Sequence, residues 1–184
     1  MNNCLIADLL AYNKGFVARA EGQPFKAQRK PAKHLALVTC LDTRLTTMLP
    51  AALGLRNGDA SIIKVAGAEV DGHYGAVMRS LLVAVHQLGV QDIMVIAHTD
   101  CGAQGMSCFS MSTLMKQAGI TDEVFEAARI EGINLEAWLE GFSVLEESVR
   151  CSVGLIRTHP FIPSSGRVQG FIIDSDTGEL TEVA

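Results

Sequence analysis

The stretch HLALVTCLDTR, residues 34–44, joins a short apolar run to three chemically reactive side chains. The run is β-branched near its end, and this composition predicts a buried strand over 34–40. Cys40, Asp42 and Arg44 then follow on alternate positions. If the chain stays extended past the strand, a thiol, a carboxylate and a guanidinium point the same way. This strand end is therefore the first place to look for a site.

Outward from this strand, the chain alternates between helix-like and strand-like segments. Helices are predicted over 46–54 and 75–89, each ending at a glycine, and strands over 61–67 and 92–98. This alternation predicts an α/β fold in which a mainly parallel β-sheet is flanked by helices. Sites in such sheets form just beyond the carboxyl ends of the strands, so the residues that follow 40 and 98 matter most.

The remaining segments complete the expected order of elements. Apolar residues at close to helical spacing predict an N-terminal helix over 2–18, and a polar stretch over 21–33 predicts a loop. Three further helices are expected over 107–117, 121–130 and 134–150. Asn134 is the expected N-cap residue of the last one. The tail RVQGFIIDSDTGELTEV (167–183) predicts a strand, a turn at Asp176–Gly178 and a final extended piece.

Composition indicates a globular protein. The chain has 184 residues, 48% hydrophobic and 19% charged, which suits one domain over 1–184, with an N-terminal helix and loop (1–32) and a core (33–184) that carries the candidate site. The formal net charge of −5 argues against nucleic-acid binding. No apolar run approaches the ~18–20 residues of a membrane span, and no signal peptide is recognisable. We therefore expect a cytoplasmic protein that does not bind membranes.

The five cysteines do not form the pattern of a disulfide framework. Their number is odd and they are widely scattered, which indicates packing residues, metal ligands or nucleophiles instead. Cys4, Cys108 and Cys151 lie in helical apolar patterns or near a chain end, and we expect them to be packing residues.

A histidine and a second cysteine follow the third predicted strand. That strand ends in HTDCG (98–102), where His98 and Cys101 are three residues apart and a turn can aim both at one point. Parallel strands that are neighbours, or one apart, bring Cys40 within reach of this pair. Zinc prefers such thiolate and imidazole ligands, at ~2.0–2.3 Å in a tetrahedron. Three protein ligands leave the fourth position open, which is typical of a catalytic zinc site.

The Asp42–Arg44 pair can control that fourth position. A bidentate arginine holds a carboxylate ionised and oriented, and beside zinc this carboxylate can accept a hydrogen bond from a metal-bound water. Released from the arginine, Asp42 can instead bind the metal and close the site. A permanently closed site would make the chain a non-catalytic zinc-binding module. A solvated surface ion pair, worth ~0–1 kcal/mol, is the plain alternative.

A cysteine-nucleophile enzyme, such as a phosphatase or sulfurtransferase, is a further alternative. Such enzymes need a thiolate cradled by backbone amides and an arginine that closes the loop. Cys40 and Arg44 are close in sequence, but Asp42 between them would repel an anionic substrate. The zinc interpretation uses all three residues and is preferred.

The two motifs together resemble those of a known enzyme family. CLDTR (40–44) is similar to the C-x-D-x-R motif of β-class carbonic anhydrases, and HTDCG is similar to their H-x-x-C-G motif, in the same order and at a fitting separation. The resemblance extends from about Lys33 to the tail GFIIDSDTGEL (170–180). The continuation DTRL…LPAALG is similar to a subgroup of short bacterial members.

This resemblance implies an α/β fold, a homodimer or higher homo-oligomer, and an N-terminal helix that packs on a partner subunit. Carried over by position, Cys40, His98 and Cys101 would bind one Zn²⁺ per chain. Asp42 and Arg44 would form a catalytic dyad. The implied enzyme is a carbonic anhydrase, which hydrates CO₂ reversibly to bicarbonate and a proton by means of zinc-bound hydroxide that the dyad orients.

One segment departs from the family's pattern. Members commonly carry Asn-Ala-Gly after the second strand, whereas this chain has Val65, Ala66 and Gly67. The small residues still allow close backbone approach, but loss of the amide makes the expected substrate pocket, formed with Gly102, more apolar. Some relatives of the family act on CS₂ or COS, linear molecules shaped like CO₂. Hydrolysis of these molecules is the alternative activity.

Overall fold

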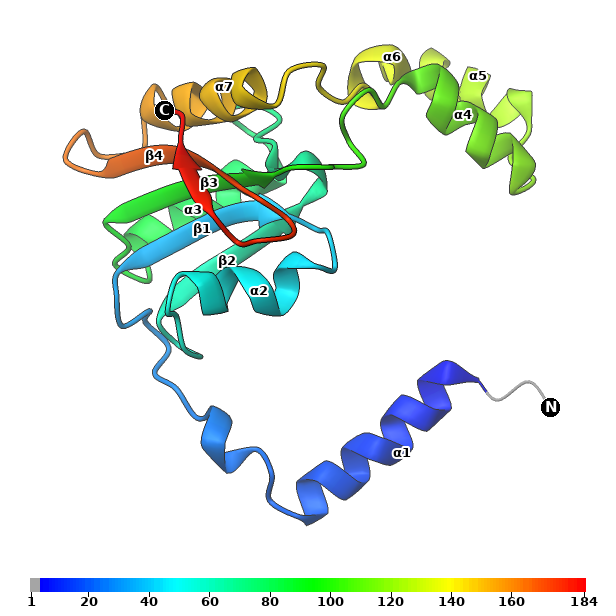
Figure 1. Cartoon of the computed structure of the whole chain (residues 1–184). Helices are drawn as coiled ribbons and strands as arrows, with labels where there is room; N and C mark the ends of the chain where they lie inside the picture. The colour runs from blue at the N-terminus through cyan, green and yellow to red at the C-terminus, as the bar shows by residue number, and fades with distance from the viewer. Residues whose placement is uncertain (1–3) are drawn as a thin grey trace.

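A five-stranded sheet with helices on both faces forms the body of the protein (Figure 1). The computed structural model describes residues 4–184. The strands are β1 (Leu35–Cys40), β2 (Ala60–Val65), β3 (Asp92–His98), β4 (Arg167–Ile173) and β5 (Leu180–Glu182). They lie in the order β2-β1-β3-β4-β5, with β1 to β4 parallel and β5 antiparallel to β4. The predicted α/β fold with a mainly parallel sheet is confirmed.

Most of the predicted helices form close to their expected positions. The α-helices are α1 (Leu5–Ala18), α2 (Leu45–Ala52), α3 (Ala76–His86), α4 (Cys108–Gln117), α5 (Asp122–Ile130), α6 (Leu135–Trp138) and α7 (Leu145–Arg157). Two short 3₁₀ turns cover Gln23–Phe25 and Ala66–Ala68. Residues 2 and 3 of the predicted N-terminal helix lie outside the described residues. No helix within residues 4–184 is both long and apolar enough to cross a bilayer.

The core has two apolar layers, one on each face of the sheet. Alternate residues of β1 explain this division, because successive side chains of a strand point to opposite faces. Ala36 and Val38 pack with α3 and α7, whereas Leu37 packs with α2. All three side chains are fully buried. Strand β1 is therefore covered on both faces, as its continuous apolar sequence predicts.

The prediction of one helix over 134–150 is wrong. Asn134 does cap a helix, because its side chain accepts a hydrogen bond from the amide of Ala137 at 3.0 Å, but that helix ends at Trp138. The chain then returns to the loop after β3, where the Gly141 amide donates to the Met106 carbonyl. Phe142 is buried there. Its apolar side chain falls at helical spacing, which explains why the sequence pattern misleads.

The second predicted strand also ends earlier than expected. It was predicted over 61–67, but β2 ends at Val65, and Gly67 has a φ of 66°. This left-handed conformation suits glycine and turns the chain away from the sheet. The predicted turn in the tail is confirmed, because the Asp174 carboxylate accepts hydrogen bonds from the amides of Asp176 and Thr177.

Helix α1 stands apart from the sheet, at the end of an extended linker (Figure 1). None of its residues is buried, and its apolar side chains at Leu5, Ile6, Leu9, Leu10 and Tyr12 are mostly exposed. The helical pattern over these residues was predicted correctly. No other part of residues 4–184 buries these apolar side chains.

Two glycines test how tightly α7 packs on the sheet. A β-carbon at Gly170 in β4 would lie 2.5 Å from Cγ1 of Val149, whereas one at Gly154 in α7 would meet nothing within 4 Å. We expect Gly170→Ala to lower the free energy of unfolding by ~1–3 kcal/mol. Gly154→Ala should leave it unchanged or raise it by up to about 1 kcal/mol. Urea unfolding of both variants checks this, and equal stabilities would contradict the packing.

Candidate metal centre

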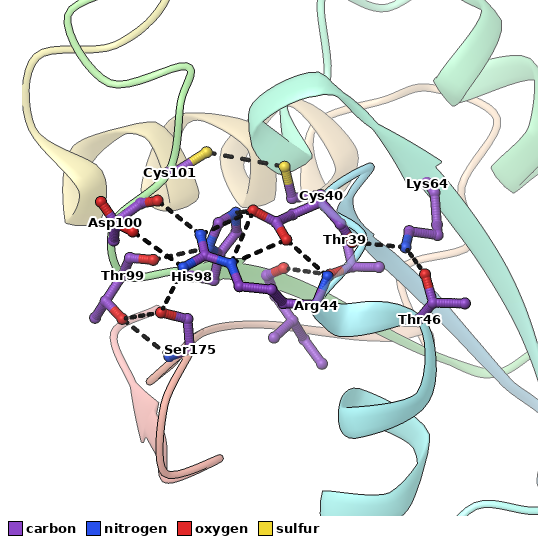
Figure 2. A network of polar contacts seen from close by, with 12 residues as sticks. Thr39, Cys40, Arg44, Thr46, Lys64, His98, Thr99, Asp100, Cys101 and Ser175 are labelled. Carbon is purple, nitrogen blue, oxygen red and sulfur yellow. Dashed lines mark hydrogen bonds and ion pairs between the residues drawn. The ribbon is translucent and has the colours of Figure 1, made fainter.

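Three ligand-type side chains converge at the carboxyl edge of the sheet. Cys40 is the last residue of β1, His98 is the last residue of β3, and Cys101 follows in the next turn. Because β1 and β3 are adjacent parallel strands, their ends lie side by side. One ligand atom from each residue lies within 4.8 Å of the others, and the two sulfur atoms are 3.8 Å apart. All three side chains are buried, and Figure 2 shows the sulfurs of Cys40 and Cys101 facing each other.

The donor atoms of this cluster fit zinc. Nδ1 of His98 donates to the carbonyl oxygen of Thr99 at 2.8 Å, an arrangement that leaves a lone pair on Nε2. Nε2 is buried and has no hydrogen-bond partner among residues 4–184, which is unusual for a buried polar atom. Two sulfurs and one imidazole nitrogen form a donor set that zinc prefers, and a tetrahedral ion held by these three would have one further position. Cys40, His98 and Cys101 would hold the ion.

The two thiols differ in acidity. Burial raises the pKa of Cys40, but the neighbouring His98 ring and the amides of Asp42 and Gly67 outweigh this effect, and the pKa falls to about 7. Burial raises the pKa of Cys101 to about 11, and the nearby Cys40 sulfur adds to the rise. The Cys40 thiol is therefore partly ionised at neutral pH without a metal, whereas the Cys101 thiolate needs a cation to offset its charge.

Asp42 and Arg44 meet through a turn, not through an extended chain. The expectation that strand geometry continues past Cys40 is wrong, because the Arg44 amide donates to Oδ1 of Asp42 at 2.8 Å and helix α2 follows at once. The guanidinium binds both carboxylate oxygens, with Nη2 2.9 Å from Oδ2. These hydrogen bonds lower the pKa of Asp42 to about 2. Oδ2 also lies 3.8 Å from Nε2 of His98.

Arg44 has a second set of partners that the sequence pattern did not reveal. Its Nη1 lies 3.0 Å from Oδ2 of Asp100, and its Nη2 donates to the Asp100 carbonyl at 2.9 Å. Ser175, just after β4, is 3.5 Å from Nη1 and also bonds to Thr99 (Figure 2). Asp100 adopts a φ of 54°, which turns the loop toward Arg44. Arg44 thus ties the ends of three strands together.

A small apolar cavity lies beside the cluster. Its volume is about 230 Å³, and Ala66, Gly67 and Gly102 line it, together with Leu41, Asp42, Ala103, Met106 and the two cysteines. Val65 does not line it. Val65 instead pairs with Cys40 across the β1–β2 ladder, and its carbonyl accepts a hydrogen bond from Leu41. A larger cavity of about 670 Å³ lies near the amino ends of β3 and β4, away from the cluster.

The other three cysteines take no part in the centre. Cys4 and Cys151 are exposed, so the expectation that they are packing residues is wrong for both within this chain. Cys108 is half-buried at the start of α4. Neither the odd number of cysteines nor their helical spacing in the sequence shows which of them are buried.

The fold and the centre define a class: an α/β protein with a Cys₂His metal site at the carboxyl edge of a parallel sheet. Residues 35–180 match the family model described as Carbonic anhydrase. "Putative carbonic anhydrase YvdA" of Bacillus subtilis is 40% identical over 178 residues, which cover 97% of this chain and 90% of that protein. Beta-carbonic anhydrase 1 of Mycobacterium tuberculosis is 32% identical, with 96% of each chain covered.

A solved structure agrees with these sequence matches. The β-carbonic anhydrase isoform I of Trichomonas vaginalis superposes with a TM-score of 0.87 at 31% identity, and the match covers 97% of each chain. This chain belongs to the β-class carbonic anhydrase family, as the two sequence motifs predicted.

The metal centre can be tested by substituting its ligands. We expect the purified protein to contain about one zinc ion per chain. Cys101→Ser should weaken zinc binding by at least ~10²-fold, because loss of an outer-sphere partner alone commonly costs 10–100-fold. Cys151→Ser, at an exposed cysteine, is the matched control and should keep full zinc content. Elemental analysis of protein purified with its thiols protected measures this, and full zinc in Cys101→Ser contradicts the ligand set.

Proposed function

We propose that the chain catalyses the reversible hydration of CO₂ to bicarbonate and a proton, with zinc held by Cys40, His98 and Cys101. The position of Asp42 carries this proposal. Its carboxylate faces the ligand cluster at 3.8 Å from Nε2 of His98, while Arg44 holds both of its oxygens. A closed, structural zinc site would need Asp42 turned from Arg44 to the metal. The observed pairing supports an open site.

The residues around the centre suit an attack by water on a small neutral molecule. Zinc held by Cys40, His98 and Cys101 would supply hydroxide near neutral pH, because zinc lowers the pKa of a coordinated water from about 15.7 toward 7 in well-known zinc enzymes. Asp42 is a hydrogen-bond acceptor that fixes the orientation of the attacking O–H group. Arg44 keeps that carboxylate ionised and aimed, since it holds the pKa of Asp42 at about 2. Orientation of this kind contributes strongly to rate.

The apolar cavity beside the centre suits a linear, uncharged substrate. Leu41, Ala103 and Met106 contribute apolar surface to the cavity. Gly67 and Gly102 have no side chains and leave room for the substrate. The same walls suit CS₂ and COS, so hydrolysis of these molecules is the second candidate activity. Release of hydrogen sulfide from CS₂ or COS by zinc-loaded protein that is inactive toward CO₂ would favour this candidate.

Asp42→Ala tests the orienting role of the carboxylate. We expect the rate of CO₂ hydration to fall by roughly 10²-fold or more, because removal of one oriented hydrogen-bonding group in an active site commonly costs 10²–10³-fold. Zinc content should not change. Stopped-flow assays with a pH indicator measure the rate.

Asp92→Asn is the matched control for this test. Asp92 is also bidentate to an arginine, Arg167, but this pair joins the first residues of β3 and β4, at the other end of the sheet. This variant should keep the wild-type rate. Retention of full activity by Asp42→Ala, or an equal loss in both variants, would contradict the proposed role.

The pH dependence provides a second test. Two thiolates place more negative charge on the metal than imidazoles do, so the pKa of the attacking water should lie above the ~7 of zinc sites with three histidines. The water must lose a proton before it attacks. We therefore expect kcat/KM for CO₂ hydration to rise toward alkaline pH, and a profile that is flat from acid to alkaline pH would count against the mechanism.

We also infer that the chain forms a homodimer or a higher homo-oligomer through α1. Within residues 4–184, no other segment covers the exposed stripe of Leu5, Leu9 and Tyr12. A second copy supplies the simplest cover for such an apolar face.

Sedimentation of the wild type and of two α1 variants tests this inference. Leu9→Asp should shift the chain toward a monomer, because a charge replaces an apolar contact. Ala11→Asp adds the same charge on the opposite side of the same helix and should sediment like the wild type. A wild-type monomer at micromolar concentration would contradict the inference.

A further inference from the structure

CO₂ hydration releases one proton for every bicarbonate, and the metal pocket offers few groups to carry it away. Among the described residues, the titratable side chains that line the pocket are the two cysteines and Asp42. The cysteines are candidate ligands, and both oxygens of Asp42 already accept hydrogen bonds from Arg44. The histidines other than His98 bond to residues outside the pocket: His34 to Gly89, His73 to Thr158, His86 to Phe161 and His159 to the His73 carbonyl.

Glu69 lies directly against the wall of this pocket. Gly67 and Ala103 both line the pocket, and a β-carbon on Gly67 would lie 2.8 Å from Oε2 of Glu69 and 3.3 Å from Cβ of Ala103. The lack of a side chain at residue 67 is what lets the carboxylate approach. The Gly67 amide is also close enough to the Cys40 thiol to lower its pKa. Gly67 therefore adjoins both the metal cluster and Glu69.

Glu69 also lines a second cavity, which opens beside α7. This cavity has a volume of about 280 Å³. Ser148 on α7 lines it and donates to Oε1 of Glu69 at 3.4 Å. Glu147 and Cys151, also on α7, are the other titratable residues that line it, and both are exposed. The cavity therefore reaches solvent, and Glu69 adjoins both this cavity and the wall of the metal pocket.

The environment of Glu69 suits a group that both accepts and releases protons. Burial raises the pKa of its carboxyl, and the hydrogen bond from Ser148 offsets part of this rise. A carboxyl whose pKa is raised toward the working pH is better matched to proton transfer than an ordinary surface glutamate.

We propose that Glu69 is the proton-transfer group that carries the proton of CO₂ hydration from the metal pocket to the cavity beside α7. The balance is CO₂ + H₂O → HCO₃⁻ + H⁺, with no change in oxidation state. A C–O bond forms while one C–O π bond of CO₂ and an O–H bond of water break, and the proton passes through pocket water to Oε2 of Glu69. Buffer in the α7 cavity then removes it. This inference rests on the proposed hydration activity.

Glu69→Gln tests the transfer step, because glutamine keeps the shape of the side chain but cannot accept the proton. We expect kcat in dilute buffer to fall roughly 10-fold or more, a loss within the range of general acid–base groups. The value of kcat/KM should stay near that of the wild type, since proton release follows conversion of CO₂. High concentrations of imidazole buffer should restore kcat, and zinc content should not change.

Glu147→Gln is the matched control. Glu147 lines the same cavity and carries the same charge, but it makes no side-chain hydrogen bond to the other residues that the structure describes. It should keep the wild-type kcat in dilute buffer. An equal loss in both variants would mean that cavity charge, and not transfer through Glu69, sets the rate.

Infrared difference spectroscopy gives a readout that does not depend on turnover. The carboxyl band of Glu69, identified by its absence in Glu69→Gln, should titrate above the ordinary glutamate pKa of about 4.3. Ser148→Ala should move this titration to still higher pH, because it removes a hydrogen bond that lowers the pKa. If the Glu69 carboxyl titrates at the ordinary glutamate pKa and Ser148→Ala does not change this pKa, the buried, hydrogen-bonded environment assigned to Glu69 is wrong.

The outcomes separate this inference from the proposed function. If wild-type protein hydrates CO₂ and Glu69→Gln keeps full kcat in dilute buffer, the role of Glu69 is wrong and the proposed function stands. If zinc-loaded wild type does not hydrate CO₂ at all, the proposed function fails and the role of Glu69 fails with it.

Discussion

The metal centre depends on two neighbouring parallel strands whose carboxyl ends lie within one residue of each other. Strands β1 and β3 pair from Leu35 opposite Asp92 to Thr39 opposite Ile96, so Cys40 and His98 emerge at one edge. A slip of one residue would turn every side chain of a strand to the opposite face, and the sulfur and the imidazole would no longer meet. Strand β1 packs against a different apolar layer on each face. A slip would move each side chain into the layer that it does not fit, so the packing opposes it.

A single arginine organises the charges around the centre. Arg44 binds two carboxylates, from Asp42 and Asp100, and these contacts raise its pKa. Its side chain is 39% exposed, so a simple surface ion pair at this place would contribute little to stability. Its value lies in geometry, since it fixes the carboxylate of Asp42 and joins the ends of β1 and β3 to the segment after β4. Loss of Arg44 would therefore displace the carboxylate of Asp42 more than it would lower the stability of the fold.

The sequence alone predicted the sheet and the ligand cluster because both follow from strong local patterns. The range 92–98 matches β3 residue for residue, and HTDCG and CLDTR were placed at one edge by the general rule for parallel sheets. The turn at Asp42 and the contact of Arg44 with Asp100 were not foreseen, since a hydrogen bond between residues 56 apart leaves no periodic signal. The break after Trp138 was missed because apolar residues of a loop imitated helical spacing.

The helical segment between residues 107 and 140 leaves and rejoins the body of the protein at nearly one point. The Gly141 amide meets the Met106 carbonyl, the Gly105 amide meets the Phe142 carbonyl, and α4, α5 and α6 lie to one side of the sheet (Figure 1). These two hydrogen bonds fix both ends of the segment beside the loop that carries Cys101, and they involve none of the residues in its middle. The length of this segment can therefore change without moving Cys101, because its two ends stay joined by these hydrogen bonds. Variation among homologues should therefore concentrate in this segment, and engineered fusions should be tolerated there while the metal centre stays intact.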